Sequence, residues 1–338
     1  MEVIRGWSHR SFQITDPSCV GEARRFCAKA VQHWGWADAD AGRLALIVTE
    51  LGTNLQRHAK GGALWIAIKE QLREVEVLAL DNGPGIADVT RALQDGVSTG
   101  SGSPGTGLGG IRRLADDFDL YSAANGTLCL ARVRASGQAT VGCPAVGAVS
   151  LCAPGEIVCG DAWAFAQGDA GEVALLVADG LGHGVHAAEA AQAAVDVFAQ
   201  APFASLEASM HETHAALQTT RGAALFLLRL EAPTQVRHTG AGNVLGRLLS
   251  GVADRTLLTQ HGTAGVQVRR PEISCTELPA HGVAVLYSDG VISRWKSDEL
   301  HPLLSRDPAL LAAAICWRHG RGRDDATVVV FKPGDGLD

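Results

Sequence analysis

A stretch of small, uncharged residues near the middle of the chain limits what the rest can fold into. Residues 137–148 contain only Gly, Gln, Ala, Thr, Val, Cys and Pro, a composition typical of a linker. The full length of 338 residues favours about two domains of roughly 150 residues each. We therefore expect one domain at residues 1–136, a linker at 137–148 and a second domain at 149–338.

The composition excludes several classes of protein. Apolar residues make up 46% of the chain and charged residues 19%, which is enough apolar material for two buried cores and excludes extensive disorder. The formal net charge is −7, which argues against a nucleic-acid binder. No apolar run is long enough to span a membrane, and no CxxC pair suggests a zinc site. We expect a reduced, cytoplasmic protein whose cysteines are small buried hydrophobes.

The pattern of the first half predicts helices and antiparallel strands that are segregated along the chain, which is typical of an α+β fold. An apolar stripe predicts a helix from Asp38 or Asp40, either of which could cap it, to about Lys60. Strands are predicted at Ala63–Lys69 and Glu74–Leu80, with a helix at about 108–116 after them.

Three groups of residues in this half carry chemistry. Glu50, Asn54 and His58 recur at four-residue intervals and so share one helical face. Asp81 ends a strand and is followed by Gly83 and Gly85, which permit a flat ligand to approach the backbone. Glycines also precede the later helix, where amide groups can bind phosphates: Gly105, Gly107 and Gly109. Taken singly, the first group is better explained as a solvated face and the residues after Asp81 as a turn, and a glycine run alone is weak evidence of a phosphate site.

The second half places carboxylates at strand ends. Strands are predicted at Ile157–Ala166 and Glu172–Ala178, joined as a hairpin, with helices at 185–200, 204–218 and 308–317. The hairpin brings Asp161 near Asp179, whereas Asp289 and Asp324 belong to later strand ends. Clustered carboxylates repel unless a cation neutralises them, and oxygen ligands without matching His or Cys indicate Mg²⁺ or Mn²⁺.

The three groups of the first half, in their order and spacing, resemble the nucleotide-binding boxes of the GHKL superfamily, and most of all the RsbT-like serine/threonine switch kinases. The resemblance implies a GHKL (Bergerat) α/β sandwich that binds ATP and Mg²⁺. It makes Glu50 the general base, Asn54 the Mg²⁺ ligand and Asp81 the adenine acceptor, beside Gly83 and Gly85. Gly105, Gly107 and Gly109 would wrap the phosphates, and residues 95–105 would form a lid.

The second half resembles the RsbX/SpoIIE-like branch of the metal-dependent PPM protein phosphatases. The motifs that carry this resemblance are Cys159-Gly-Asp-Ala, Val177-Ala-Asp-Gly-Leu-Gly-His-Gly, His238-Thr-Gly-Ala-Gly-Asn243, Tyr287-Ser-Asp-Gly-Val and Arg323-Asp-Asp-Ala-Thr. It implies a PPM-type αββα sandwich with two Mn²⁺ or Mg²⁺ ions. Asp179 would bridge the ions, and the other ligands would be the Gly180 carbonyl, Asp161, Asp289 and Asp324.

Together the resemblances imply a fused kinase and phosphatase acting on serine or threonine of a STAS-domain antagonist, or of a stressosome-like protein. Two alternatives to the kinase stay open for the first half. It could be a non-catalytic module that senses ATP, or it could be an anti-sigma factor. The partner is expected to be neither nucleic acid nor membrane, and a homodimer is left open.

Overall fold

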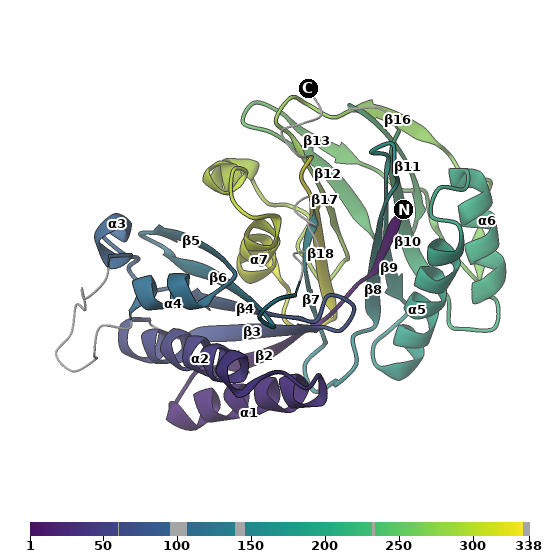
Figure 1. The fold of residues 1–338 in the computed structure, drawn as a ribbon. Helices are drawn as coiled ribbons and strands as arrows, with labels where there is room; N and C mark the ends of the chain where they lie inside the picture. Colours follow the sequence, from purple (N-terminus) through teal and green to yellow (C-terminus); the bar gives the residue numbers. More distant parts are fainter. Residues whose placement is uncertain (60, 95–106, 139–145, 232–233, 334–338) are drawn as a thin grey trace. The chain divides into compact units, whose positions relative to one another are not determined.

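The computed structural model describes residues 1–59, 61–94, 107–138, 146–231 and 234–333. The chain forms two compact units, which we describe separately. The inserted unit comprises His9–Gly142, and the outer unit comprises Met1–Ser8 together with Cys143–Asp338. Each combines helices with antiparallel strands, which confirms the expected two-domain α+β fold (Figure 1).

The inserted unit is one sheet with helices on one face. Its neighbouring strands, all antiparallel, follow the order β2-β3-β4-β6-β5. The elements in chain order are β2 (His9–Gln13), α1 (Pro17–His33), α2 (Asp38–His58), β3 (Gly62–Lys69), β4 (Glu74–Asp81), α3 (Val89–Ala92), α4 (Leu108–Leu114), β5 (Asp117–Ala123) and β6 (Gly126–Arg134).

The two long helices of the inserted unit begin differently. Helix α1 has a side-chain cap, because Asp16 accepts a hydrogen bond from Ser18 N and Pro17 follows it. Helix α2 has none: Ala37 is its cap residue, so the predicted cap at Asp38 or Asp40 is wrong. The carboxylate of Asp40 instead accepts hydrogen bonds from the backbone N–H and hydroxyl of Ser136.

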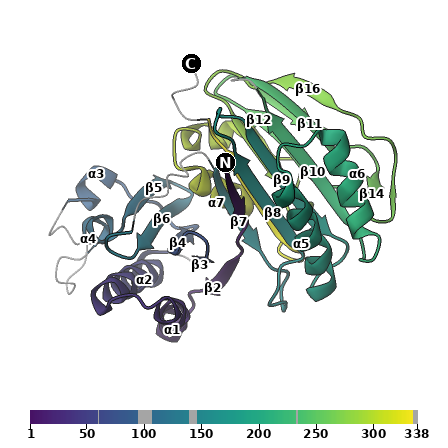
Figure 2. The same ribbon diagram turned by 45° about the vertical axis from the view of Figure 1, so that its right-hand side comes forward.

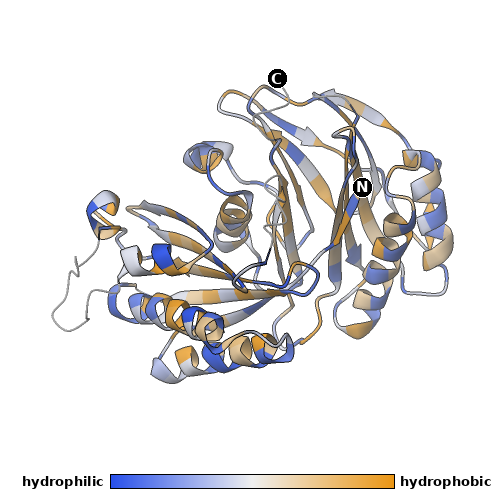
Figure 3. Ribbon diagram, in the orientation of Figure 1, coloured by the Kyte–Doolittle hydropathy of each residue, from blue (hydrophilic) through white to orange (hydrophobic). Residues whose placement is uncertain are grey.

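The core of the inserted unit lies between α1, α2 and the sheet. Leu44, Ile47 and Leu51 of α2 are almost fully buried against alternate residues of β3 and β4 such as Ile66 and Val77. Hydrophobic and hydrophilic residues are intermixed along both helices (Figure 3), with the buried ones recurring every three or four residues, as expected of helices that cover one side of a sheet.

The outer unit contains the remaining elements: β1 (Glu2–Arg5), β7 (Val146–Leu151), β8 (Asp161–Gln167), β9 (Val173–Gly180), α5 (Val185–Gln200), α6 (Leu206–Leu217), β10 (Ala223–Leu230), β11 (Gln235–Ala241), β12 (Leu245–Leu249), β13 (Asp254–Leu257), β14 (Gly262–Thr263), β15 (Gln267–Val268), β16 (Ser274–Glu277), β17 (Val283–Tyr287), η1 (Ser297–Leu303), α7 (Pro308–His319) and β18 (Ala326–Phe331).

These elements form an αββα sandwich, as the sequence predicted. One sheet has the order β1-β8-β9-β10-β11-β16, and the strands facing it follow the order β13-β12-β17-β18-β7. Apolar side chains of both sheets, such as Phe165, Phe226 and Phe331, fill the space between them. Helices α5 and α6 cover the first sheet, and α7 covers β7 and β18 (Figures 1 and 2).

The first strand departs from the predicted domain boundary. Residues 1–8 were assigned to the first domain, but β1 pairs with β8, so that Ile4 lies opposite Phe165 in the outer unit. Ile4 is 2% exposed in the core between the sheets, and Trp7 packs edge-on against Trp163 at 4.7 Å. This burial explains why the segment belongs with a sheet that is distant in sequence.

The predicted linker is only partly tested by the structure. Residues 139–145 lie outside the described residues, and Val146–Ala148 already belong to β7, so the second unit begins before residue 149. Among the described helices, none combines the length and the apolar character that crossing a membrane requires.

We predict that Ile4→Ala lowers the free energy of unfolding of the outer unit by about 2–5 kcal/mol, because it removes a buried side chain and leaves a cavity. The measurement is urea unfolding of the full chain, followed by fluorescence and by limited proteolysis of each unit. The matched control is Glu2→Ala, an exposed residue of the same strand. Equal stability of the two variants would contradict the role assigned to β1.

Candidate active sites

The outer unit brings two aspartates together across adjacent strands. Asp161 is the first residue of β8, and Asp179 is the next-to-last residue of β9. The two are directly opposite each other in the antiparallel pair, as the predicted hairpin required. Directly opposite residues have Cβ atoms about 4.5–5.5 Å apart, so two carboxylates share one end of the sheet.

The facing sheet contributes the other two aspartates. Strands β17 and β18 pair, so Asp289, just after β17, and Asp324, just before β18, lie at the same end of that pair. Gly290 is required at this junction, because a Cβ there would lie 1.9 Å from the carbonyl oxygen of Asp325.

Ser288 connects the two sheets of the outer unit at this point. Its hydroxyl donates to Oδ2 of Asp161 at 2.6 Å and accepts from the backbone N–H of Thr327 at 2.9 Å. The sequence analysis missed this residue. Its position beside Asp289 in the run Ser288-Asp289-Gly290 is the only local signal.

Mutual repulsion among the carboxylates shifts their titration. Burial raises the pKa of Asp179 to about 9, and the negative charges of Asp161, Asp289 and Asp324 add to the increase. Burial also raises the pKa of Asp161 to about 7, opposed by the hydrogen bond from Ser288. The four predicted side chains therefore lie within electrostatic reach of one another, and their oxygen atoms fit a divalent cation such as Mg²⁺ or Mn²⁺.

Gly180, the fifth predicted metal ligand, is fixed in place by its surroundings. Its backbone N–H donates to the Gly160 carbonyl at 3.1 Å. A Cβ at this position would lie 2.1 Å from the carbonyl oxygen of Ala187 in α5. The close approach of the helix requires glycine here and holds the backbone beside Asp179 rigid.

Exposed apolar side chains flank the aspartates along the chain, and some of them line a cavity together with Asp161. The segment before Asp161 carries Ile157 and Val158, and α5 begins with Val185, which is 57% exposed. These residues, together with Asp161 and Trp7, line a cavity of about 660 Å³. Leu181 follows Asp179 by two residues and Ile292 follows Asp289 by three, and both are also exposed. We refer to these five exposed residues, which lie near the aspartates in the chain, as the apolar rim: Ile157, Val158, Leu181, Val185 and Ile292.

In the inserted unit, α2 presents the predicted polar face. Glu50 and Asn54 are one helical turn apart and partly exposed, whereas Leu51 and Leu55 point into the core. His58 is the last residue of the helix and is exposed.

The loop after β4 passes close to the end of α2. Oδ1 of Asp81 accepts from the backbone N–H groups of Gly83 at 2.6 Å and Thr127 at 3.2 Å. A Cβ on Gly83 would lie 3.2 Å from the carbonyl oxygen of His58. Asp81 and the C-terminal turn of α2 therefore converge, which brings two of the predicted groups to one place.

The other glycines predicted to bind nucleotide lie in the loop after β4 and around the start of α4. Gly85 has a φ of +76° and a Cβ there would lie 2.1 Å from the Ala123 carbonyl oxygen, so the loop itself requires glycine. Gly107 directly precedes α4, and Gly109 is buried in the first turn of that helix. Gly105 and the whole predicted lid at 95–105 lie outside the described residues.

Comparisons with known proteins match both units. Residues 15–132 match the family described as histidine kinase-like ATPase domain, and residues 169–333 match the family of stage II sporulation protein E (SpoIIE). The serine/threonine-protein kinase RsbT of Bacillus subtilis (strain 168) is 33% identical over 124 residues, which cover 33% of this chain and 90% of RsbT.

Solved structures resemble just over half of the chain. A structure from the bacterial stressosome, described as a modular system adapted to control secondary messenger signalling, has a TM-score of 0.51 and 28% identity. That match covers 55% of this chain and 97% of the other. RsbX in complex with magnesium has a TM-score of 0.48 and 22% identity, covering 55% of this chain and 92% of RsbX.

We predict that, without divalent metal, the free energy of unfolding of the outer unit falls as the pH rises from about 4 to about 9. The folded carboxylates hold protons up to a pKa of about 7 for Asp161 and about 9 for Asp179, against an ordinary value of 3.8. The folded state therefore binds more protons than the unfolded state over this range, and raising the pH favours unfolding.

The measurement is the thermal midpoint across this pH range, with chelator and then with Mn²⁺. Mn²⁺ should reverse the fall, and Asp179→Asn should remove most of it. The control Asp298→Asn changes an exposed aspartate and should leave the fall intact. A midpoint that rises steadily with pH in chelator would contradict the clustering of these carboxylates.

Proposed function

Because the chain belongs to the RsbT-type family of histidine kinase-like ATPases through one unit and to the SpoIIE family through the other, we propose that it both adds and removes phosphate on a partner protein. The inserted unit would be an ATP-dependent serine/threonine kinase, and the outer unit a Mg²⁺- or Mn²⁺-dependent phosphatase. The observation that carries the proposal is the meeting of four aspartates at one end of the outer unit, where a bound cation would offset their repulsion.

In the phosphatase reaction, the chain's own contribution is to hold its carboxylates in place. Asp179 would bridge two divalent ions, with Asp161, Asp289, Asp324 and the Gly180 carbonyl as further ligands. When bound, such ions supply an activated water and neutralise the charge of the phosphoryl group. Ser288 orients Asp161 through its 2.6 Å hydrogen bond, so that one oxygen stays directed toward the cluster.

In the kinase reaction, positioning matters most, because phosphoryl transfer depends largely on alignment and charge neutralisation. Both hydrogen bonds to Asp81 use Oδ1, so Oδ2 would accept from the adenine amine. Asn54 would hold Mg²⁺ on ATP, and Glu50, one turn earlier on α2, would accept the proton of the substrate hydroxyl. The loop would present Gly83 and Gly85 to the adenine ring, and Gly105, Gly107 and Gly109 would bind the phosphates.

The partner would be a folded protein, of the STAS-domain antagonist class or a stressosome-like protein. The apolar rim supports a protein substrate, because exposed apolar patches typically mark protein contacts. The similarity to RsbT, and to a structure from the bacterial stressosome, supports the class.

Two opposed activities in one chain would only consume ATP unless they alternate. We therefore propose reciprocal control, by nucleotide or by the partner. The alternative is a phosphatase whose inserted unit binds ATP without transferring phosphate. Glu50 favours transfer, because a module that only binds nucleotide has no need of a base beside Asn54.

We predict that Glu50→Gln keeps ATP affinity within about twofold but lowers transfer of labelled γ-phosphate to a STAS-domain substrate by roughly 10²–10⁴-fold, the usual contribution of a general base. Asp81→Asn should instead abolish ATP binding, measured by calorimetry. Asp179→Asn should increase the amount of labelled product, because the phosphatase activity that removes the label is lost. Glu22→Gln, an exposed glutamate of α1, is the control. A wild-type chain that binds ATP yet labels no STAS substrate would support the ATP-sensing alternative.

We predict that the double variant Ile157→Asp with Val185→Asp raises KM for a phosphorylated protein substrate about tenfold, or about 1.4 kcal/mol, because the rim then repels an apolar partner. Hydrolysis of p-nitrophenyl phosphate, which is too small to contact the rim, should change less than about twofold. The control Val252→Asp alters a residue that is 97% exposed between β12 and β13. An equal loss toward both substrates would mean that the rim residues support the metal site instead.

A further inference from the structure

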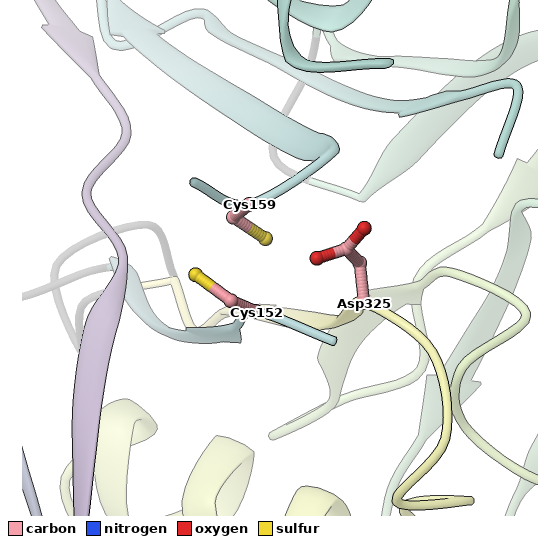
Figure 4. A group of neighbouring side chains, drawn as sticks. All are labelled: Cys152, Cys159 and Asp325. Carbon is pink, nitrogen blue, oxygen red and sulfur yellow. The ribbon is translucent and has the colours of Figure 1, made fainter. Parts of the chain in front are cut away.

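Two cysteines and an aspartate meet in the outer unit behind the carboxylate cluster. The sulfur atoms of Cys152 and Cys159 and a carboxylate oxygen of Asp325 all lie within 4.8 Å of one another. The three side chains point toward one another from separate segments, just after β7, just before β8 and just before β18 (Figure 4). From the sequence, the cysteines were predicted to be small buried hydrophobes, whereas Cys152 is only partly buried.

The aspartate of this group is incompletely satisfied. Asp325 is 4% exposed, and its Oδ1 accepts from the backbone N–H of Ala153 at 2.8 Å. Its Oδ2 is buried, and among the described residues it meets no donor with normal hydrogen-bond geometry, although the backbone of Gly160 and the thiol of Cys159 lie close to the carboxyl group. A buried acceptor that lacks a donor destabilises the fold, more so when it is charged, so a cation bound between this oxygen and the two sulfurs would offset that cost.

We propose that Cys152, Cys159 and Asp325 form a zinc site distinct from the aspartate cluster. Zinc binds sulfur at about 2.3 Å and carboxylate oxygen at about 2.0–2.2 Å in a tetrahedron, which places neighbouring ligands within the separation observed. Soft sulfur ligands select zinc over Mg²⁺ and Mn²⁺, so ions bound by the aspartates do not compete for this site. Each thiol loses its proton to solvent on binding.

The exposure of the three residues indicates where the fourth coordination position of the zinc lies. Cys159 and Asp325 are buried, whereas Cys152 is only partly buried. The fourth coordination position is therefore on the side of Cys152, where solvent can supply a water. Cys159 precedes Asp161 by two residues and Asp325 follows Asp324 directly, so a bound zinc braces two segments that carry members of the aspartate cluster.

The test uses cobalt as a probe, because Co²⁺ bound to thiolate gives a sulfur-to-metal charge-transfer absorption that carboxylate ligands do not give. The full chain is kept reduced and saturated with Mg²⁺, and then titrated with Co²⁺. We expect the band to saturate at one equivalent and to disappear when Zn²⁺ is added. Zn²⁺, but not Mg²⁺, should also protect Cys152 from alkylation, as measured by mass spectrometry.

Variants assign the band to these residues. Cys152→Ser and Cys159→Ser should each remove it, and Asp325→Asn should weaken Co²⁺ binding by at least the roughly 10- to 100-fold that changes around metal ligands usually cost. Cys275→Ser, an exposed cysteine of β16, should leave it intact. Cys152 is the decisive position, since its partial exposure makes a serine easy to accommodate. Absence of the band in the wild type, or its survival in folded Cys152→Ser, would overturn the proposal.

Discussion

Repulsion between buried negative charges is the constraint around which the outer unit is organised. Asp161 and Asp179 face each other across β8 and β9, and Asp289 and Asp324 extend from the other sheet toward the same end. Hydrogen bonds such as the one from Ser288 oppose the resulting increase in pKa only in part, so the pKa of Asp161 stays at about 7 and that of Asp179 at about 9. The hydrophobic core between the sheets supplies the rigidity that keeps these groups together despite their repulsion.

In the inserted unit, the pKa of the buried carboxylate of Glu76 is shifted in the opposite direction. Burial alone would raise the pKa of Glu76, but Lys69 at 2.7 Å and Arg132 at 2.6 Å hold it well below its ordinary range. His9 adds a further contact at 3.2 Å. A carboxylate with two cationic neighbours is a structural element, whereas the four clustered aspartates of the outer unit form no ion pair with a described residue and suit a bound cation. The contrast separates sites of stability from sites of chemistry within one chain.

The sequence predicted those elements that depend on neighbouring residues alone. The Asp161–Asp179 hairpin follows from two short strands and a glycine-rich turn, and helix α2 follows from its apolar stripe. Helix α1 was missed although Asp16 and Pro17 form a recognisable start. The pairing of β1 was missed because four residues contain no signal for a partner so distant in sequence. The meeting of Cys152 with Cys159 and Asp325 likewise depends on tertiary structure, and the spacing of the cysteines matches no familiar motif.

The pairing of β1 with β8 also imposes an order on biosynthesis. Ile4 leaves the ribosome well before Phe165, the residue it faces, and the whole inserted unit is made in between. At about 5–20 residues per second, the interval is roughly 10–30 s, ample time for the inserted unit to fold while β1 waits unpaired. The nascent chain therefore carries an unpaired strand, with the apolar side chains of Val3 and Ile4 uncovered, ahead of a domain that is free to fold.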